Sequence, residues 1–179
     1  MSIIKHKEQR VAIFIDVQNL YYSARNLYGR KVDFGEILKT AVAGRKLIRA
    51  IAYVVKTKTG EEQPFFEALT KLGIEAKERE LQEFYGGAKK ADWDVGLTID
   101  MIRICPIVDT VILVSGDGDF VPVVEYLKSQ GRQVEVMAFG KSTSTKLREA
   151  ADDFIDLSSD FKKYLKFTIR PVQKQAKLR

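Results

Sequence analysis

The sequence has very few of the residues that form disulfides or bind soft metals. Among its 179 residues there is one cysteine, Cys105, and one histidine, His6. A single cysteine cannot form an internal disulfide, and together the two residues do not supply a ligand set for zinc. Any metal bound by this chain is therefore expected to have oxygen ligands.

Long hydrophobic runs are also missing. No stretch approaches the roughly 20 apolar residues needed to cross a bilayer, and the N-terminal MSIIKHKEQR lacks the apolar segment of a secretory signal. These absences predict a soluble, cytoplasmic protein that has no membrane partner.

Most of the chain also lacks an excess of charge of either sign. The formal net charge is +6, but residues 160–179 contain seven of the 30 basic residues and one of the 24 acidic residues, so residues 1–159 are neutral overall. A length of 179 residues with 45% hydrophobic content suits one domain. We predict a domain over 1–159 and a basic C-terminal tail over 160–179, which either binds nucleic-acid phosphates or only keeps the protein soluble.

Apolar runs rich in branched side chains predict strands that are buried on both faces of a sheet. They lie at residues 11–15, 48–55, 111–115 and 134–139. Segments with helical spacing lie around and between them, at residues 20–27, 34–42, 64–72, 94–104 and 120–130. This alternation predicts an α/β fold with a mostly parallel central sheet.

Three shorter segments complete this prediction. Residues 74–81 alternate apolar and charged side chains, which suits an edge strand with one wet face. Residues 154–158 predict another short strand. Residues 83–91 contain two glycines and show no period, so we expect a loop there that leads toward the functional site.

Aspartates follow two of the predicted strands and begin one predicted helix. Asp16 comes directly after residues 11–15, Asp117 and Asp119 follow residues 111–115, and Asp94 begins the helix at 94–104. In an open parallel sheet, ligands bind outside the carboxyl ends of the strands, where the strand order reverses. Carboxylates gathered there repel one another unless divalent cations such as Mg²⁺ or Mn²⁺ hold them. The pattern therefore predicts metal-dependent phosphodiester chemistry.

Each of these acids also has an ordinary structural explanation. Asp94 could only cap its helix, and Asp117 and Asp119 could only form a turn. Asp100 lies six residues after Asp94, about 240° around the helix axis, so the two cannot face one ion squarely. Asp100 could instead be a core acid bonded to the backbone, and Asn19 could either cap the next helix or contact the scissile phosphate.

The segment SGDGDF combines small residues with its two acids. Gly116 and Gly118 are expected to permit a sharp turn between strand and helix, so that Asp117 and Asp119 can both face the site. Ser115 offers a hydroxyl nearby.

Aromatic and basic residues near the predicted site suit contacts with single-stranded RNA, because unpaired bases stack on aromatic rings and phosphates attract lysine and arginine. Tyr21, Tyr22 and Trp93 also lie near it, although core packing explains Tyr21 and Tyr22 about equally well. The residues predicted to contact RNA are Phe84, Tyr85, Lys89, Lys90, Lys162, Lys163, Lys166 and Arg170.

The motifs FIDVQNL at 14–20, DVGLTIDM at 94–101 and LVSGDGDF at 113–120, followed by GRQVEVMAFG at 131–140, occur in this order. The set resembles the NYN domain of the PIN-like nuclease superfamily, in particular its LabA-like branch, over about residues 10–158. The resemblance implies a three-layer α/β/α sandwich, Rossmann-like in its parallel sheet, that carries a metal-dependent ribonuclease site.

The resemblance also implies roles for particular residues. The matching acids are Asp16, Asp94, Asp117 and Asp119, and the supporting positions are Asn19, Asp100 and Ser115. This chain departs from the family pattern in KKADWDVGL at 89–97, where Asp92 is an additional acid. Whether Asp92 or Asp94 is the metal ligand therefore stays open.

The leading hypothesis is a ribonuclease in which metal-activated water attacks single-stranded RNA. The alternative is a catalytically weak RNA-binding or protein-interaction module with the same fold, and a homodimer is compatible with either. A phosphatase or nucleotide hydrolase is disfavoured, because no DxDxT follows the first strand and no GxxxxGK[ST] loop is present.

Overall fold

The protein is described here by a computed structural model, which covers residues 3–56, 62–80, 82–83, 89–90 and 92–166. A six-stranded sheet forms its centre, in the order β4-β3-β1-β7-β8-β9, and all neighbouring strands are parallel. The predicted α/β class with a parallel sheet is confirmed. The strands are β1 (Arg10–Asp16), β3 (Lys46–Lys56), β4 (Glu75–Glu80), β7 (Thr110–Val114), β8 (Gln133–Ala138) and β9 (Asp153–Asp156).

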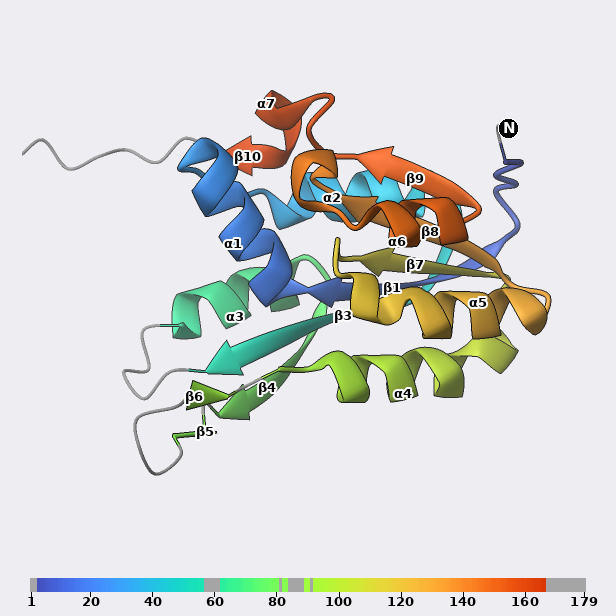
Figure 1. The fold of residues 1–179 in the computed structure, drawn as a ribbon, viewed down its shortest axis with the longest axis horizontal. Helices are drawn as coiled ribbons and strands as arrows, with labels where there is room; N and C mark the ends of the chain where they lie inside the picture. The colour runs from blue at the N-terminus through green and yellow to red at the C-terminus, as the bar shows by residue number, and fades with distance from the viewer. Residues whose placement is uncertain (1–2, 57–61, 81, 84–88, 91, 167–179) are drawn as a thin grey trace, which may run out of the picture.

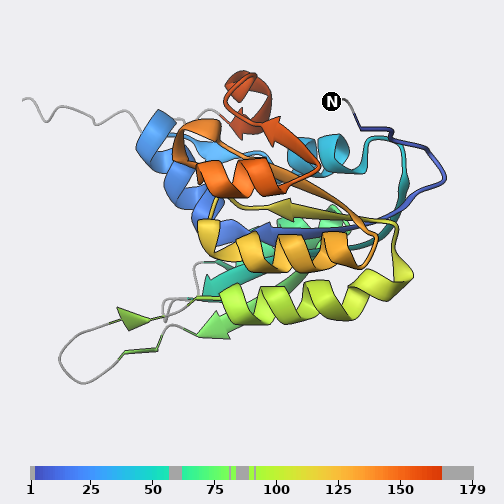
Figure 2. The ribbon, with the colours of Figure 1, turned by 45° about the vertical axis from the view of Figure 1, so that its right-hand side comes forward.

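Helices cover both faces of this sheet and make three layers (Figures 1 and 2). One face packs against α1 (Val17–Tyr28), α2 (Phe34–Val42), α3 (Gln63–Lys71) and the short α7 (Phe161–Tyr164). The other face packs against α4 (Asp94–Ile104), α5 (Val121–Ser129) and α6 (Thr145–Ala150). Short 3₁₀ turns are η1 (Cys105–Ile107), η2 (Gly118–Phe120) and η3 (Gly140–Ser142).

Strand β1 shows why the apolar runs become central strands. Side chains alternate across a strand, so Ile13 and Ile15 enter the core below α1 and α2, whereas Ala12 and Phe14 enter the core below α4 and α5. All four are fully buried. A strand covered on both faces needs apolar residues at every position, and this gives a continuous run.

The strand order reverses at β1. From β1 the chain moves to β3 and β4 on one side, and it then returns to place β7, β8 and β9 on the other. Ile15 pairs with Val114 in register, so the residues that follow β1 and β7 leave the sheet side by side. A ligand crevice is expected at this point of a parallel sheet.

Some short elements differ from the sequence prediction. The segment 83–91 was expected to be a loop, but β5 (Gln82–Glu83), which overlaps its start, and β6 (Lys89–Lys90) form an antiparallel pair. Pairs this short carry no hydrophobic period, which explains why the pattern did not reveal them. The turn η3 and helix α6 were not predicted.

The first residues after the predicted boundary at 159 pack on the domain. Strand β10 (Leu165–Lys166) pairs with β2 (Lys31–Val32), and the Phe161 ring stacks on Tyr28 with centroids 5.1 Å apart. Tyr164 and Leu165 are only 5% and 3% exposed. The packed core therefore extends to Leu165, although the division into domain and tail stays a prediction.

None of the helices in the described part of the chain has the length and apolar character needed to cross a bilayer.

Candidate functional site

Three carboxylates meet at the carboxyl rim of the sheet. Asp94, Asp117 and Asp119 each offer an oxygen, and these oxygens all lie within 4.8 Å of one another. Asp94 is the first residue of α4, and its N-cap is Trp93, so Asp94 does not cap the helix. Asp117 caps η2 by accepting a hydrogen bond from the Asp119 backbone at 3.0 Å. Asp117 therefore both forms the turn and belongs to the cluster.

Asp16 adjoins this cluster at the end of β1. Its Oδ1 accepts a hydrogen bond from the Asn19 backbone at 3.1 Å and caps α1, while its Oδ2 accepts one from the Ser115 hydroxyl at 3.0 Å. The same hydroxyl accepts a hydrogen bond from the Asp117 backbone at 3.2 Å. Ser115 therefore links Asp16 to the loop that carries the other acids.

Asn19 ties the same two segments together. It is not a cap: it lies inside α1, and its Oδ1 accepts a hydrogen bond from the Gly116 backbone at 2.9 Å. Strand β1 with its helix and the loop after β7 are thus joined twice, through Ser115 and through Asn19. These contacts fix Asp16 relative to Asp117.

The two glycines of SGDGDF were expected to permit a sharp turn, but the structure gives another reason for them. Neither Gly116 nor Gly118 has a positive φ, so the turn does not require glycine for its backbone angles. A Cβ on Gly116 would lie 2.9 Å from Thr143 Oγ1 and 3.2 Å from the Ser142 carbonyl, and a Cβ on Gly118 would lie 2.8 Å from Ser144 Oγ. The glycines make room for the segment that follows β8.

The electrostatics of the cluster suit a cation. Burial, together with the negative charges of Asp16, Asp117, Asp92 and Asp119, raises the pKa of Asp94 to about 6. Burial also raises the pKa of Asp16, against the effect of its hydrogen bonds. Within the described residues, no lysine or arginine forms an ion pair with Asp94, Asp117 or Asp119. The donor set therefore fits a hard divalent cation.

Asp100 lies apart from these acids. It accepts hydrogen bonds from Tyr53 Oη at 2.7 Å and from Lys77 Nζ at 2.6 Å, so its partners are side chains and not the backbone. Burial raises the pKa of Asp100, but the hydrogen bonds from Lys77 and Tyr53 outweigh burial and bring the pKa below its ordinary value. Asp100 thus joins α4 to β3 and β4.

A cleft of about 520 Å³ opens beside the cluster, between α1 on one layer of the sandwich and the start of α4 on the other. It is lined by Asp16, Gln18, Asn19, Tyr22, Ser23, Asn26, Leu27, Tyr53, Asp92, Trp93, Asp94, Asp117 and Ser142.

The family model described as NYN domain matches residues 10–159. The chain belongs to the NYN domain family. Low amplitude and bright protein LabA from Synechococcus elongatus is 30% identical over 174 residues, which cover 92% of each chain. Uncharacterized protein MJ0482 from Methanocaldococcus jannaschii is 27% identical over 161 residues, which cover 86% of this chain and 58% of that protein.

A solved structure supports the same assignment. The crystal structure of VPA0982, a protein of unknown function from Vibrio parahaemolyticus, matches with a TM-score of 0.82 and 33% identity over 92% of this chain and all of that chain. The predicted membership of the NYN family and the predicted α/β sandwich are therefore confirmed.

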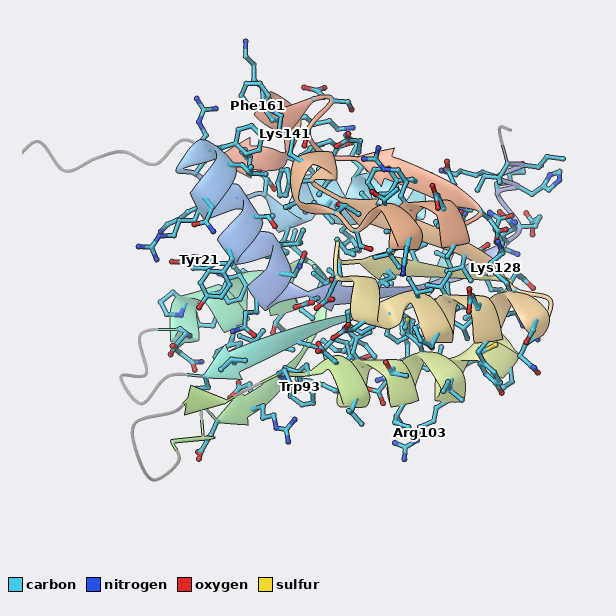
Figure 3. All side chains as sticks on the ribbon, in the orientation of Figure 1. Tyr21, Trp93, Arg103, Lys128, Lys141 and Phe161 are labelled. Atoms are coloured by element: carbon cyan, nitrogen blue, oxygen red, sulfur yellow. The ribbon has the colours of Figure 1, made fainter. Side chains whose placement is uncertain are left out.

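Trp93 comes directly before Asp94 in this NYN domain and anchors the start of α4. Its Nε1 donates a hydrogen bond to the Val54 carbonyl at 2.9 Å, and its ring meets Tyr53 edge-on at 5.4 Å. Arg79 lies 5.8 Å above the ring and donates to the Asp92 carbonyl at 2.8 Å. Figure 3 shows Trp93 at the start of α4, beside β3. The N-terminus of α4, and with it Asp94, is fastened to the sheet.

Both acids beside Trp93 line the cleft, but of the two only Asp94 belongs to the group of three carboxylates. Of these two acids, Asp94 is therefore the one that lies with the other carboxylates. The positive end of the α4 dipole also favours a carboxylate at the first residue of the helix.

The residues predicted to contact RNA either do not line the cleft or have side chains that the structure does not describe. Phe84, Tyr85 and Arg170 are outside the described residues, and for Lys89 and Lys90 only the backbone of β6 is described. The remaining predicted lysines are exposed, and none of them lines the cleft of the NYN domain. They are Lys162, Lys163 and Lys166.

Of the α1 side chains that line the cleft, Tyr22 was named from the sequence as a residue near the site, whereas Gln18 and Asn26 were not. Tyr21 and Tyr22 are 48% and 50% exposed, so the core-packing explanation is wrong for both, and Tyr22 lines the cleft. The signal was present as a spacing of four, since Gln18, Tyr22 and Asn26 recur on one side of the helix after Asp16.

Proposed function

We propose that this NYN protein is a metal-dependent ribonuclease that hydrolyses phosphodiester bonds of single-stranded RNA in the cleft. The observation that carries the proposal is the group of carboxylate oxygens within 4.8 Å of one another on Asp94, Asp117 and Asp119. Like charges at this separation are unfavourable without a cation, and they coincide with the switch point of a parallel sheet.

Asp94, Asp117 and Asp119 would hold Mg²⁺ or Mn²⁺, with Asp16 next to them. When bound, such an ion supplies a water of lowered pKa and neutralises charge on the phosphate. All-oxygen donors suit these hard cations better than softer ones.

The chain's own residues hold the site in place before any ligand arrives. Ser115 and Asn19 position Asp16 against the loop of Asp117, and Trp93 fixes the first turn of α4. The raised pKa of Asp94, about 6, means that this carboxyl is mostly ionised at pH 7.5 and largely protonated at pH 5. A protonated carboxyl is a poor metal ligand, so we expect activity to fall as the pH drops below about 6.

The deciding experiment compares cleavage of labelled single-stranded RNA by the wild type and Asp117→Asn in Mg²⁺, Mn²⁺ or EDTA. Losing a metal ligand should slow cleavage by at least about 100-fold, because the ion contributes several kcal/mol to the transition state. Asp160→Asn is the matched control, since Asp160 is an exposed acid whose side chain does not cap α7. It should cleave like the wild type.

Two results would contradict the proposal. Equal cleavage by wild type and Asp117→Asn, or cleavage that persists in EDTA, would show that the carboxylates are not the site. RNA binding without cleavage in either metal would favour the alternative, a catalytically weak RNA-binding module.

A further inference from the structure

One wall of the cleft has no part in holding a metal. Helix α1 starts directly after Asp16, and Gln18, Tyr22 and Asn26 all line the cleft. Residues four apart on a helix form one row, and eight residues span about 12 Å. This length corresponds to about three stacked nucleotides at roughly 3.4 Å each. The row therefore leads away from the carboxylates over a distance that suits part of a nucleic-acid strand.

The side chains in this row are available for a ligand. Among the described residues, Gln18 and Asn26 make no side-chain hydrogen bond, and Tyr22 has a ring contact only with its neighbour Tyr21, at 5.7 Å. Tyr22 is 50% exposed. Two free amides thus flank an open aromatic ring inside a concave site.

A second aromatic ring lines the cleft from the other layer of the sandwich. Trp93 is held there by its hydrogen bond to the Val54 carbonyl and by the edge contact with Tyr53, so its ring is fixed before a ligand binds. Tyr22 lies on α1, and Trp93 is the N-cap residue of α4. The cleft is therefore bounded by aromatic residues from both helical layers.

The chemistry of this lining points to bases and not to phosphates. No lysine or arginine is among the described residues that line the cleft. Aromatic rings stack on unpaired bases, and the amides of Asn and Gln both donate to and accept from base edges. A duplex cannot use such a wall, because its bases are already stacked and paired.

We propose that Gln18, Tyr22 and Asn26, on the opposite side of the cleft from Trp93, bind consecutive unpaired nucleobases of an RNA strand whose phosphodiester lies at the carboxylates. The position of the phosphodiester rests on the proposed function, whereas base binding by the wall does not. Tyr22 and Trp93 supply the stacking surfaces, and Gln18 and Asn26 contact the edges of bases on either side of Tyr22.

Trp93 makes the test direct. It is the only tryptophan in the sequence, so the intrinsic tryptophan fluorescence of the full chain reports on this wall. The experiment uses the Asp117→Asn protein, which prevents cleavage and removes one negative charge beside the cleft. It is titrated with hexamers of A, C, G and U, with an RNA duplex and with DNA hexamers of the same sequences.

Single-stranded RNA should quench Trp93 to saturation, and the duplex should not. In the same background, Tyr22→Ala should raise the Kd roughly 5- to 150-fold, the range expected for loss of one stacked base. Tyr21→Ala is the matched control, because Tyr21 is equally exposed on the same helix but does not line the cleft. Its Kd should stay within about twofold. Gln18→Ala with Asn26→Ala should reduce the differences in Kd among the four hexamers.

Several outcomes would overturn the proposal. These are unchanged Trp93 fluorescence with every RNA hexamer, equal weakening by Tyr21→Ala and Tyr22→Ala, or quenching by the duplex as strong as by single strands. Tighter binding of the DNA hexamers than of the RNA hexamers would show that these residues bind single-stranded DNA and not RNA. Quenching without cleavage by the wild type would refute only the proposed function, and cleavage without quenching would refute only this inference.

Discussion

At the scale of single residues, the site contains an acid whose ionisation works against folding. The pKa of Asp94 rises from its ordinary value of 3.8 to about 6, because the carboxyl is partly buried among other acids. The folded state then binds more protons than the unfolded state between about pH 4 and 6, so the contribution of Asp94 to stability is lost as the pH rises through that window.

We therefore expect Asp94→Asn to stabilise the metal-free protein at pH 7.5. The gain should be on the order of 1 kcal/mol, since water screens part of the repulsion at a partly exposed carboxylate. At pH 4 the difference should disappear, because the wild-type carboxyl is then protonated in the folded state. Urea unfolding in EDTA at the two pH values measures both quantities.

Asp109 provides a control of opposite sign. Hydrogen bonds from Arg10 lower its pKa to about 2, so Asp109 stabilises the fold above its unfolded pKa and loses this effect only in strong acid. Asp109→Asn should destabilise the protein at pH 7.5. If Asp94→Asn also destabilised the metal-free protein there, the repulsion inferred for the cluster would be wrong.

Some of these residues could be predicted from local sequence pattern, whereas contacts between distant segments could not. Asp16 and Asp117 could be predicted because Asp16 ends one strand and Asp117 closely follows another, and the ends of parallel strands meet at one rim. The partners of Asp100, which lies on α4, could not be predicted, since Tyr53 lies on β3 and Lys77 on β4. Such contacts depend on register, which local pattern does not encode.

At the scale of elements, a second segment, which follows β8, packs closely on the loop after β7. The Ser144 backbone donates a hydrogen bond to the Gly116 carbonyl at 2.9 Å, and Ser144 also caps α6. From the sequence, the glycines were expected to serve only the sharp turn, because η3 and α6 were not predicted. Elements of three and six residues are too short to show a period.

Gly116→Ala tests this close approach. The added Cβ would lie 3.1 Å from the Thr143 Cα and 3.2 Å from the Ser142 carbonyl, as well as 2.9 Å from Thr143 Oγ1. Because two of these contacts are with backbone, the loops must separate, and we expect a loss of roughly 1–3 kcal/mol of stability. Mn²⁺ should bind more weakly, since Asp117 is displaced. Thermal unfolding with and without Mn²⁺ measures both effects.

The second variant in this test is Gly116→Ala with Thr143→Ala, which removes only the hydroxyl contact. It should remain destabilised. Full rescue would show that the side chain alone was in the way, and wild-type stability of Gly116→Ala would show that the two segments do not need to touch.

At the scale of the whole molecule, the order of the strands decides where the site can be. The reversal at β1 sets α1 and the loop after β7 side by side, and α4 reaches the same rim from the opposite layer (Figure 1). The parallel sheet and its edge strand β4 could be predicted from alternation of apolar runs. The cleft could not, because it is formed by side chains from both layers.

Residues 160–166 and residues 167–179 should differ in their effect on the protein when they are deleted. A chain that ends at Ser159 loses the buried Tyr164 and Leu165, together with the hydrogen bond from the Asp33 backbone to the Tyr164 carbonyl at 2.8 Å. Removing large buried side chains costs about 2–5 kcal/mol each, so this chain should be strongly destabilised. A chain that ends at Lys166 keeps these contacts and should unfold at a higher temperature than the chain that ends at Ser159.

The chain that ends at Lys166 also isolates the charge of residues 167–179, which contain four basic residues and no acid. If these residues bind RNA phosphates, the slope of log K against log salt should fall by up to about 3, at roughly 0.7 for each phosphate contact on a single strand. RNA titrations from low to moderate salt, in the Asp117→Asn background, measure that slope. An unchanged slope with unchanged affinity would mean that the tail only contributes to solubility, and that RNA is held by the cleft and the folded surface alone.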